Sequence, residues 1–294
     1  MDQIAQQGKK GEYLTMGPEL KIDEIGYWSE VKLSILDEYA KPYNQITHAH
    51  RLKTVYIDAF AGAGHHISKT SDRLIEGSPV RAMNVDPPFD RLHFVDIDAA
   101  RVKELKRLAS GRPEVSVHRG DCNTVLVKEI FPGISYENFE RALCILDPYG
   151  LHLDWQVIEV AGKSRITEIF LNFPVMDMNM NVFWANPDGV VDKSKERMTR
   201  FWGDNSWKDA AYSTLPGLFG DFEVKNSIEQ VTDAFKRRLK ENAGFGYVPD
   251  PMPMRNTKGA IVYFLFFAAQ KPTAEKIVKQ IFEKYRHRGE VPNG

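Results

Sequence analysis

The stretch that most constrains the fold covers residues 54–64 and reads TVYIDAFAGAG. Its first half is β-branched and aromatic, which predicts a buried strand, and it ends in an acid followed by two glycines. Glycine adopts backbone conformations closed to other residues and lets a ligand approach the main chain closely. Doubly wound α/β proteins begin a nucleotide pocket with such a strand and turn. A plain tight connection between two elements is the alternative.

Further strands alternate with helical segments along the chain. They are expected at residues 91–98, 115–118, 142–146 and 166–173. This alternation predicts a mostly parallel central sheet with right-handed crossovers, which is a Rossmann-like α/β fold. An extended segment at 247–254 and an apolar strand at 260–268 predict an antiparallel pair at the sheet edge.

We expect one domain over residues 1–294, with three segments set apart by composition. Residues 1–21 are polar and are expected to be a flexible N-terminus. An amphipathic pattern predicts a helix within 22–45 that stops at Pro42. The aromatic-rich stretch 176–244 predicts a helical insertion that covers the carboxyl edge of the sheet.

A loop is expected at residues 65–77, between the glycine turn and a helix that Ser78 caps and Pro79 begins. His65 and His66 fall in this loop. We expect no metal site there, because no cysteine or carboxylate follows at ligand spacing.

A dinucleotide dehydrogenase is disfavoured by the spacing. Its fingerprint needs a third glycine three residues after the second, where this chain has Ile67. The ribose-binding acid should follow by about 20 residues, whereas Asp96 lies 32 residues after Gly64 (96 − 64). S-adenosylmethionine (SAM) is the better candidate ligand.

The predicted SAM site lies at the carboxyl ends of the first four strands of the sheet in chain order. The turn at 58–64 would wrap the methionine end, Asp96 would hold the ribose, and Asp121 would hold the adenine amino group. The predicted cofactor-binding residues are Asp58, Phe60, Ala61, Gly62, Gly64, Asp96, Ile97, Asp121 and Cys122.

The fourth strand supplies the predicted chemistry, through Asp147, Pro148 and Tyr149. Residues 147–150 read DPYG and resemble the Asp-Pro-Pro-Tyr tetrapeptide of amino-group methyltransferases. In those enzymes the acid and a proline carbonyl accept hydrogen bonds from the target amine, and the aromatic ring stacks on a flipped base. Tyr149 replaces the second proline, so the match is partial. The alternative is a strand-ending turn, which this sequence also favours.

Charge and cysteine content limit the cellular setting. The formal net charge is −1, and residues 225–294 hold 13 basic and 7 acidic side chains, which gives +6. This region is a candidate nucleic-acid contact, and a solvated helix face is the alternative. Cys122 and Cys144 are expected to be reduced and buried. Without a leader or an apolar run near 18 residues, we expect a cytoplasmic protein with no membrane contact.

Several motifs together resemble the three-Cys-motif partner (TcmP) family. They are Trp28 with Lys32, residues 56–64, residues 77–79, residues 94–98, residues 146–150, residues 172–174, Phe201 and Gly203 with Trp207, and residues 263–268. The resemblance covers about residues 25–282 and implies a class I SAM-dependent methyltransferase-like fold. It also implies a partner, since the family is named for its pairing with a radical-SAM-like protein that carries three cysteines. The arginine that members often place after the fifth strand is replaced here by the MNMN of residues 178–181.

These observations predict a SAM-dependent methyltransferase that acts on an amino nitrogen of a nucleobase or nucleic acid. Two alternatives stay open. One is a catalytically silent scaffold for the three-Cys-motif protein, and the other is a methyltransferase for a peptide or small metabolite. An enclosed pocket under residues 176–244 would favour the metabolite, and an open basic groove would favour nucleic acid.

Overall fold

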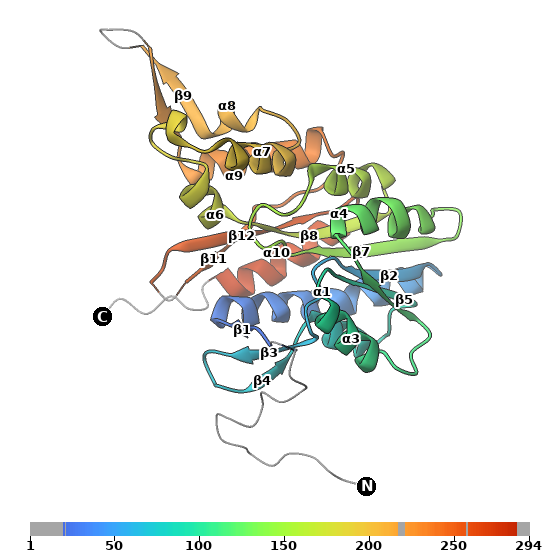
Figure 1. Ribbon diagram of the computed structural model, residues 1–294. Helices are drawn as coiled ribbons and strands as arrows, with labels where there is room; N and C mark the ends of the chain where they lie inside the picture. The colour runs from blue at the N-terminus through green and yellow to red at the C-terminus, as the bar shows by residue number, and fades with distance from the viewer. Residues whose placement is uncertain (1–19, 21, 217–220, 257, 287–294) are drawn as a thin grey trace.

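The structure is a computed structural model that describes residues 20, 22–216, 221–256 and 258–286 (Figure 1). Its largest feature is a seven-stranded sheet with the strand order β11-β12-β8-β7-β2-β5-β6. These strands are β2 (Lys53–Asp58), β5 (Arg91–Asp96), β6 (Val115–Arg119), β7 (Glu140–Leu146), β8 (Thr167–Phe173), β11 (Met252–Arg255) and β12 (Ile261–Ala268).

Strand direction confirms the predicted class. The five strands from β6 to β8 pair in parallel, β12 pairs antiparallel with β8, and β11 pairs antiparallel with β12. The chain moves outward from β2 through β5 to β6 and then returns to β7 on the other side of β2. Ligands of open α/β sheets bind outside the carboxyl ends of the strands at such a switch point. The fold is a Rossmann-like, class I methyltransferase fold, and β2 and β7 mark its expected ligand crevice.

Helices cover both faces of this sheet (Figure 1). One buried cluster joins the sheet to α1, α2, α3 and α10, and a second joins it to α4 through α9. Tyr56 faces the first cluster while Val55 and Ile57 face the second, as expected for alternating side chains of a strand covered on both faces. The first-face helices are α1 (Tyr27–Ala49), α2 (Ser78–Met83), α3 (Ala99–Leu108) and α10 (Pro272–Arg286). On the second face, α4 (Cys122–Val125) continues into a π-helical turn (Leu126–Ile130) and a 3-10 turn (Phe131–Gly133), and α5 (Trp155–Ser164) follows β7.

Helix α1 is longer than predicted. It begins at Tyr27 and ends at Ala49, with Pro42 inside it, so the expected stop at Pro42 was wrong. Proline removes one helical hydrogen bond and crowds the preceding turn. Tyr43 and Thr47 lie beyond the proline and are buried, so packing against the sheet outweighs that local cost.

The segment 65–77 is a hairpin and not the predicted loop. Strands β3 (His65–Ser68) and β4 (Leu74–Glu76) pair antiparallel, and β1 (Glu24–Ile25) pairs parallel with β3. The expected capping role of Ser78 was also wrong, because Gly77 occupies the N-cap position of α2. The Ser78 hydroxyl instead donates to Asp58 Oδ2 at 2.6 Å.

The stretch 176–244 is mostly helical and includes one hairpin. It comprises most of α6 (Val175–Asn181), a 3-10 turn (Pro187–Gly189), α7 (Asp192–Trp202), α8 (Trp207–Ala211), β9 (Tyr212–Leu215), β10 (Phe222–Lys225) and α9 (Ile228–Glu241). Most of it packs on the face of the sheet that α5 covers, and α6 is the part that reaches the carboxyl edge (Figure 1). No helix within the described ranges has both the length and the apolar content needed to cross a bilayer.

Candidate functional site

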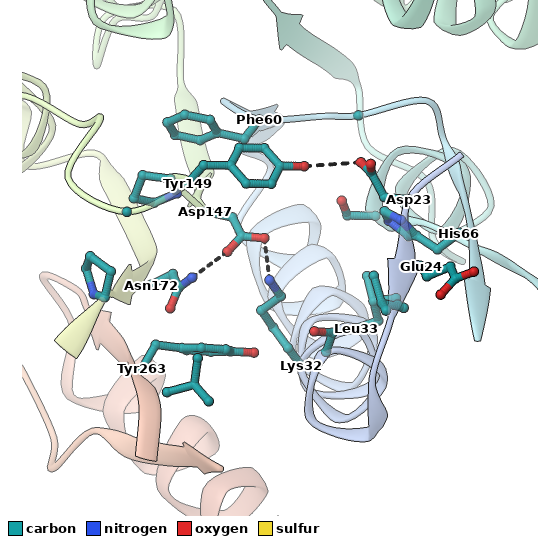
Figure 2. Close-up of a pocket in the computed structure, with 18 of the residues that line it drawn as sticks. Asp23, Glu24, Lys32, Leu33, Phe60, His66, Asp147, Tyr149, Asn172 and Tyr263 are labelled. Atoms are coloured by element: carbon teal, nitrogen blue, oxygen red, sulfur yellow. Dashed lines mark hydrogen bonds and ion pairs between the residues drawn. The ribbon is translucent and has the colours of Figure 1, made fainter. Parts of the chain in front are cut away.

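A cavity of about 1080 Å³ opens at the carboxyl ends of β2, β7 and β8 (Figure 2). Its walls come from α1, β1, the glycine turn after β2, the β3–β4 hairpin, α6 and β12. Six of the residues predicted from sequence line it, namely Phe60, Ala61, Gly62, Asp147, Pro148 and Tyr149. The structure therefore brings the glycine turn and the tetrapeptide together around one space.

The glycine turn leaves its backbone open to a ligand at Gly62. This residue has φ +65°, and a Cβ built on it would meet nothing nearer than His66 Cε1 at 4.0 Å. Asp96 supports the turn from the next strand, because its Oδ2 accepts a hydrogen bond from the Gly62 N–H at 2.9 Å. A left-handed glycine with free space above it fits close approach of a ligand to the main chain.

Asp58 and Gly64 lie behind this turn and do not line the cavity. The Asp58 carboxylate accepts hydrogen bonds from the Phe60 N–H at 3.2 Å and from Ser78 Oγ. Burial raises the pKa of Asp58 to about 6, although these hydrogen bonds oppose the rise. Gly64 packs so tightly that an added Cβ would lie 2.6 Å from Leu108 Cδ1. Both residues shape the turn and join it to α2 and α3.

Asp96 and Ile97 follow the end of β5, beside the glycine turn. Asp96 is 6% exposed, and its Oδ1 also accepts the N–H of Asp98 at 2.8 Å. Ile97 is 70% exposed, which is high for an isoleucine next to a buried acid. Asp98 caps α3, because its carboxylate accepts the N–H groups of Ala100 and Arg101. Neither Asp96 nor Ile97 lines the cavity itself.

Asp121 and Cys122 follow β6, the strand beyond β5. Asp121 is exposed and caps α4 by accepting the Asn123 N–H at 3.3 Å. Cys122 is buried, and burial with the nearby Asp121 raises the pKa of its thiol to about 12. The Cys122 side chain is therefore protonated and packs in the core of the second face. Cys144 is buried as well, and neither cysteine forms a disulfide.

The Asp147 carboxylate contacts two side chains that were not predicted from the sequence to be site residues. Lys32 Nζ forms an ion pair with Asp147 Oδ2, and Asn172 Nδ2 donates to Asp147 Oδ1 at 2.8 Å (Figure 2). Burial lowers the pKa of Lys32, but Asp147 and Tyr263 raise it further, so it ends well above its usual value. A lysine on the sheet-facing side of the first helix was the signal that could have pointed to this contact.

Tyr149 is held at the mouth of the cavity. Its hydroxyl donates to Asp23 Oδ2 at 3.2 Å (Figure 2). Arg101 Nη2 donates to the same oxygen at 2.7 Å. The residue is still 61% exposed. Burial of the hydroxyl and the charge of Asp23 raise the pKa of Tyr149. A large and mostly exposed ring is thus presented beside Asp147, with the Arg101 guanidinium 6.0 Å from its centre.

Three polar atoms in the cavity wall lack hydrogen-bond partners among the described residues. They are Asn172 Oδ1, His66 Nδ1 and Tyr263 Oη. Buried polar atoms in proteins are nearly always hydrogen-bonded, so three unpaired atoms around one cavity indicate a ligand with polar groups. Over the same described ranges, no cluster of three or more His, Cys, Asp or Glu side chains is placed to hold a metal ion.

The basic residues that the structure describes between 225 and 286 do not gather at this cavity, and none of them lines it. Those on α9 and on α10 lie on helices that pack into opposite faces of the sheet. Several are already paired, as Lys236 is with Asp250 and Lys284 is with Glu38. Residues 287–294 lie outside the described part of the chain.

Comparison with known proteins adds little to this description. No family model matches the chain, and no curated protein matches it. Among solved structures, a Legionella pneumophila protein with the family model DUF519 has 12% identity and a TM-score of 0.48, over 90% of this chain and 94% of its own.

The names of two further similar structures mention S-adenosylmethionine. A Listeria monocytogenes protein assigned to the SAM-dependent methyltransferases has 15% identity and a TM-score of 0.38, over 83% of this chain and 96% of its own. TYW2 of M. jannaschii, in complex with AdoMet, has 8% identity and a TM-score of 0.34, over 82% of this chain and 75% of its own. These values are too low to carry an argument, so the fold assignment depends on the strand order described above.

Proposed function

We propose that this chain is a SAM-dependent methyltransferase that transfers a methyl group to an amino nitrogen of a nucleobase, free or within a nucleic acid. One observation carries the proposal. The Asp147 carboxylate and the exposed ring of Tyr149 share a cavity with the open backbone of Gly62 at the switch point of the sheet.

The residues around the switch point fit SAM. The turn at 60–62 would hold the methionine end, where Gly62 leaves its main chain accessible. Asp96 would accept hydrogen bonds from the ribose, because each of its oxygens accepts one backbone N–H and a carboxylate oxygen can accept a second hydrogen bond. Its Oδ2 also lies 3.7 Å from Arg101 Nη1. Ile97 would offer its exposed apolar surface to the adenine, with Asp121 and Cys122 beyond it. When bound, SAM supplies an electrophilic methyl group on a sulfonium.

The remaining residues would position the acceptor. Asp147 would accept an N–H of the target amino group and aim the nitrogen lone pair into the cavity. Tyr149 would stack its ring against the base. Holding two reactants in line accounts for much of the rate of such a transfer, so these roles need no covalent step on the protein. Because no described basic residue of 225–286 lines the cavity, we propose recognition of the base itself and not of a run of phosphates.

A second candidate function is the scaffold for a three-Cys-motif partner. The observation that favours it is that both oxygens of Asp147 already have partners, Lys32 and Asn172. In a catalytically silent scaffold with this fold, the carboxylate that once contacted the substrate would be expected to form such contacts within the protein.

Methyl transfer is tested with tritiated SAM and a panel of single-stranded RNA and DNA oligonucleotides, free nucleosides and glutamine-containing peptides. We expect label in an amino-bearing base, and we expect Asp147→Ala to lower the rate by about 100-fold or more, the usual scale for a lost positioning contact. Asp250→Ala, which removes an exposed surface acid, is the matched control. Full activity of Asp147→Ala would contradict the role of Asp147. SAM binding without transfer to any acceptor would favour the scaffold.

A further inference from the structure

We infer that Lys32 donates a hydrogen bond to the ring nitrogen beside the target amino group. Lys32 and Asp147 together would then select a base edge on which a hydrogen-bond acceptor adjoins the amino group. Adenine and cytosine carry this edge on their Watson–Crick side, with N1 beside N6 and N3 beside N4. The inference rests on the proposed function and names the acceptor edge for the same site. It makes Lys32 a specificity-determining residue that touches the acceptor.

The Lys32 ammonium has hydrogen-bonding capacity left over. It carries three N–H donors, and one of them goes to Asp147. The other two meet no acceptor atom in the described part of the chain. The side chain is 11% exposed and its Nζ lies 5.6 Å from the centre of the Tyr263 ring, so bulk water has little access to it. Buried donors of a charged group are costly to leave unpaired, so a ligand acceptor is expected here.

Asn172 supplies the complementary acceptor. A carboxylate only accepts hydrogen bonds, so the amide atom that faces Asp147 must be the donor Nδ2. This fixes the direction of Asn172 Oδ1, which is buried in the cavity wall without a partner. Asp147 keeps lone pairs beyond the two that Lys32 and Asn172 use. An Asp147 carboxylate oxygen and Asn172 Oδ1 could therefore accept hydrogen bonds from the two hydrogens of one amino group.

Donor and acceptors together form one pattern around Asp147 (Figure 2). Lys32 offers N–H groups from below the carboxylate, while Asp147 and Asn172 offer oxygens. An amino group next to an unprotonated ring nitrogen matches all of them. An alkyl amine would match the oxygens but would leave the Lys32 donors unpaired, and a site built to hydrogen-bond a missing atom discriminates strongly.

The test is a binding cycle that changes one atom of the ligand and one residue of the protein. Adenosine and 1-deazaadenosine, in which C–H replaces N1, are titrated into the chain in the presence of S-adenosylhomocysteine by calorimetry. Cytidine and 3-deazacytidine form a second pair. Each pair is measured with the wild-type chain, with Lys32→Met, and with Lys163→Met as control, because Lys163 forms an ion pair with Glu159 at the surface.

We expect the wild-type chain and Lys163→Met to bind at least one natural nucleoside ten-fold or more tightly than its deaza analogue. Lys32→Met should bind both members of that pair equally. Equal binding of both pairs by the wild-type chain, discrimination that survives in Lys32→Met, or no binding of any nucleoside would overturn the inference. Lys32→Met leaves Asp147 without its cation, so a Lys32→Met/Asp147→Asn double variant, which keeps the pair neutral, replaces it if folding fails.

This result is separable from that of the proposed function. If the chain discriminates between the nucleosides through Lys32 but transfers no methyl group, the proposed methyltransferase activity is contradicted and the proposed recognition of the base edge is supported. If it transfers methyl groups without this discrimination, the activity is supported and the proposed role of Lys32 is contradicted.

Discussion

Asp147 obtains its surroundings from residues that are distant in the chain. Lys32 precedes it by 115 residues and Asn172 follows it by 25. The tetrapeptide predicted the acid and the neighbouring Tyr149 from local sequence alone. The cation beside them depends on how α1 packs across the sheet, and no spacing in the sequence encodes that distance. For this reason the candidate site was only partly predictable at the level of single residues.

Glu168 gives a pH-dependent prediction for stability. It lies on β8 beneath α1, burial raises its pKa to about 7, and the Tyr39 hydroxyl donates to its Oε2 at 2.5 Å. A carboxyl with a raised pKa in the folded chain stabilises folding below its unfolded pKa of about 4.5. That contribution is lost as the pH rises to about 7.

We therefore predict that Glu168→Gln gains stability relative to the wild-type chain as the pH rises from 5 to 8, by roughly 1 to 3 kcal/mol. Urea unfolding at the two pH values measures the change. Glu241→Gln, at an exposed position of α9, should show no such trend. An equal effect of Glu168→Gln at both pH values would show that the carboxyl titrates normally in the folded chain.

At the scale of elements, α5 touches the segment that follows α9, and the contact is at a glycine. A Cβ on Gly162 of α5 would lie 2.1 Å from the carbonyl oxygen of Ala243, a backbone atom that cannot rotate away. Glycine inside a helix usually costs about 0.5–1 kcal/mol relative to alanine. Because of this close approach, we expect glycine to be more stable than alanine at position 162.

We predict that Gly162→Ala destabilises the chain by roughly 1 to 3 kcal/mol, the usual cost of overpacking a core. The free energy of unfolding in urea is the measurement. Gly133→Ala is the control, because nothing lies within 4 Å of its added Cβ. A stabilised Gly162→Ala chain would mean that α5 and the segment after α9 are not packed as described.

The elements themselves were predictable where local signals and burial agree. Predicted strands at 142–146, 166–173 and 260–268 are observed as β7, β8 and β12 within two residues at each end. Two predictions failed because tertiary contacts override local rules. Pro42 is retained inside α1 by packing. Residues 65–77 form two strands that pair with each other, and β1, which is distant in the sequence, pairs with the first of them.

At the scale of the whole molecule, the insertion and the sheet share one core. The Phe235 ring of α9 lies 4.5 Å from that of Phe173 in β8 and 5.4 Å from that of Phe266 in β12, centre to centre. Phe235 is fully buried. A helix anchored in this way should not unfold separately from the sheet.

We predict one cooperative unfolding transition, with coincident changes in far-UV circular dichroism and tryptophan fluorescence. Phe235→Ala should lower the free energy of unfolding by about 3 to 5 kcal/mol and shift both signals together. Phe222→Ala, at an exposed position of β10, should change it little. Two separated transitions would instead identify residues 176–244 as an independent unit.

The crevice at the switch point is the part of the site that sequence could predict best. Parallel strands bring their carboxyl ends to one edge, so Gly62, Asp96, Asp121 and Asp147 fall along that edge whatever the details of packing. The walls supplied by α1 and β1 depend on contacts across the whole chain and were not predicted. The wall supplied by α6 belongs to the stretch that was expected to cover this edge.

The central claim, that this edge binds SAM, is tested most directly by calorimetric titration of the purified chain with S-adenosylhomocysteine. We predict micromolar binding that Asp96→Ala weakens by about 1 to 3 kcal/mol, roughly 5- to 150-fold, the usual cost of leaving hydrogen-bonding groups unpaired. Asp98→Asn, which preserves the cap of α3 two residues away, should bind as the wild-type chain does. Absence of binding to the wild-type chain, or equal binding by Asp96→Ala, would contradict the account.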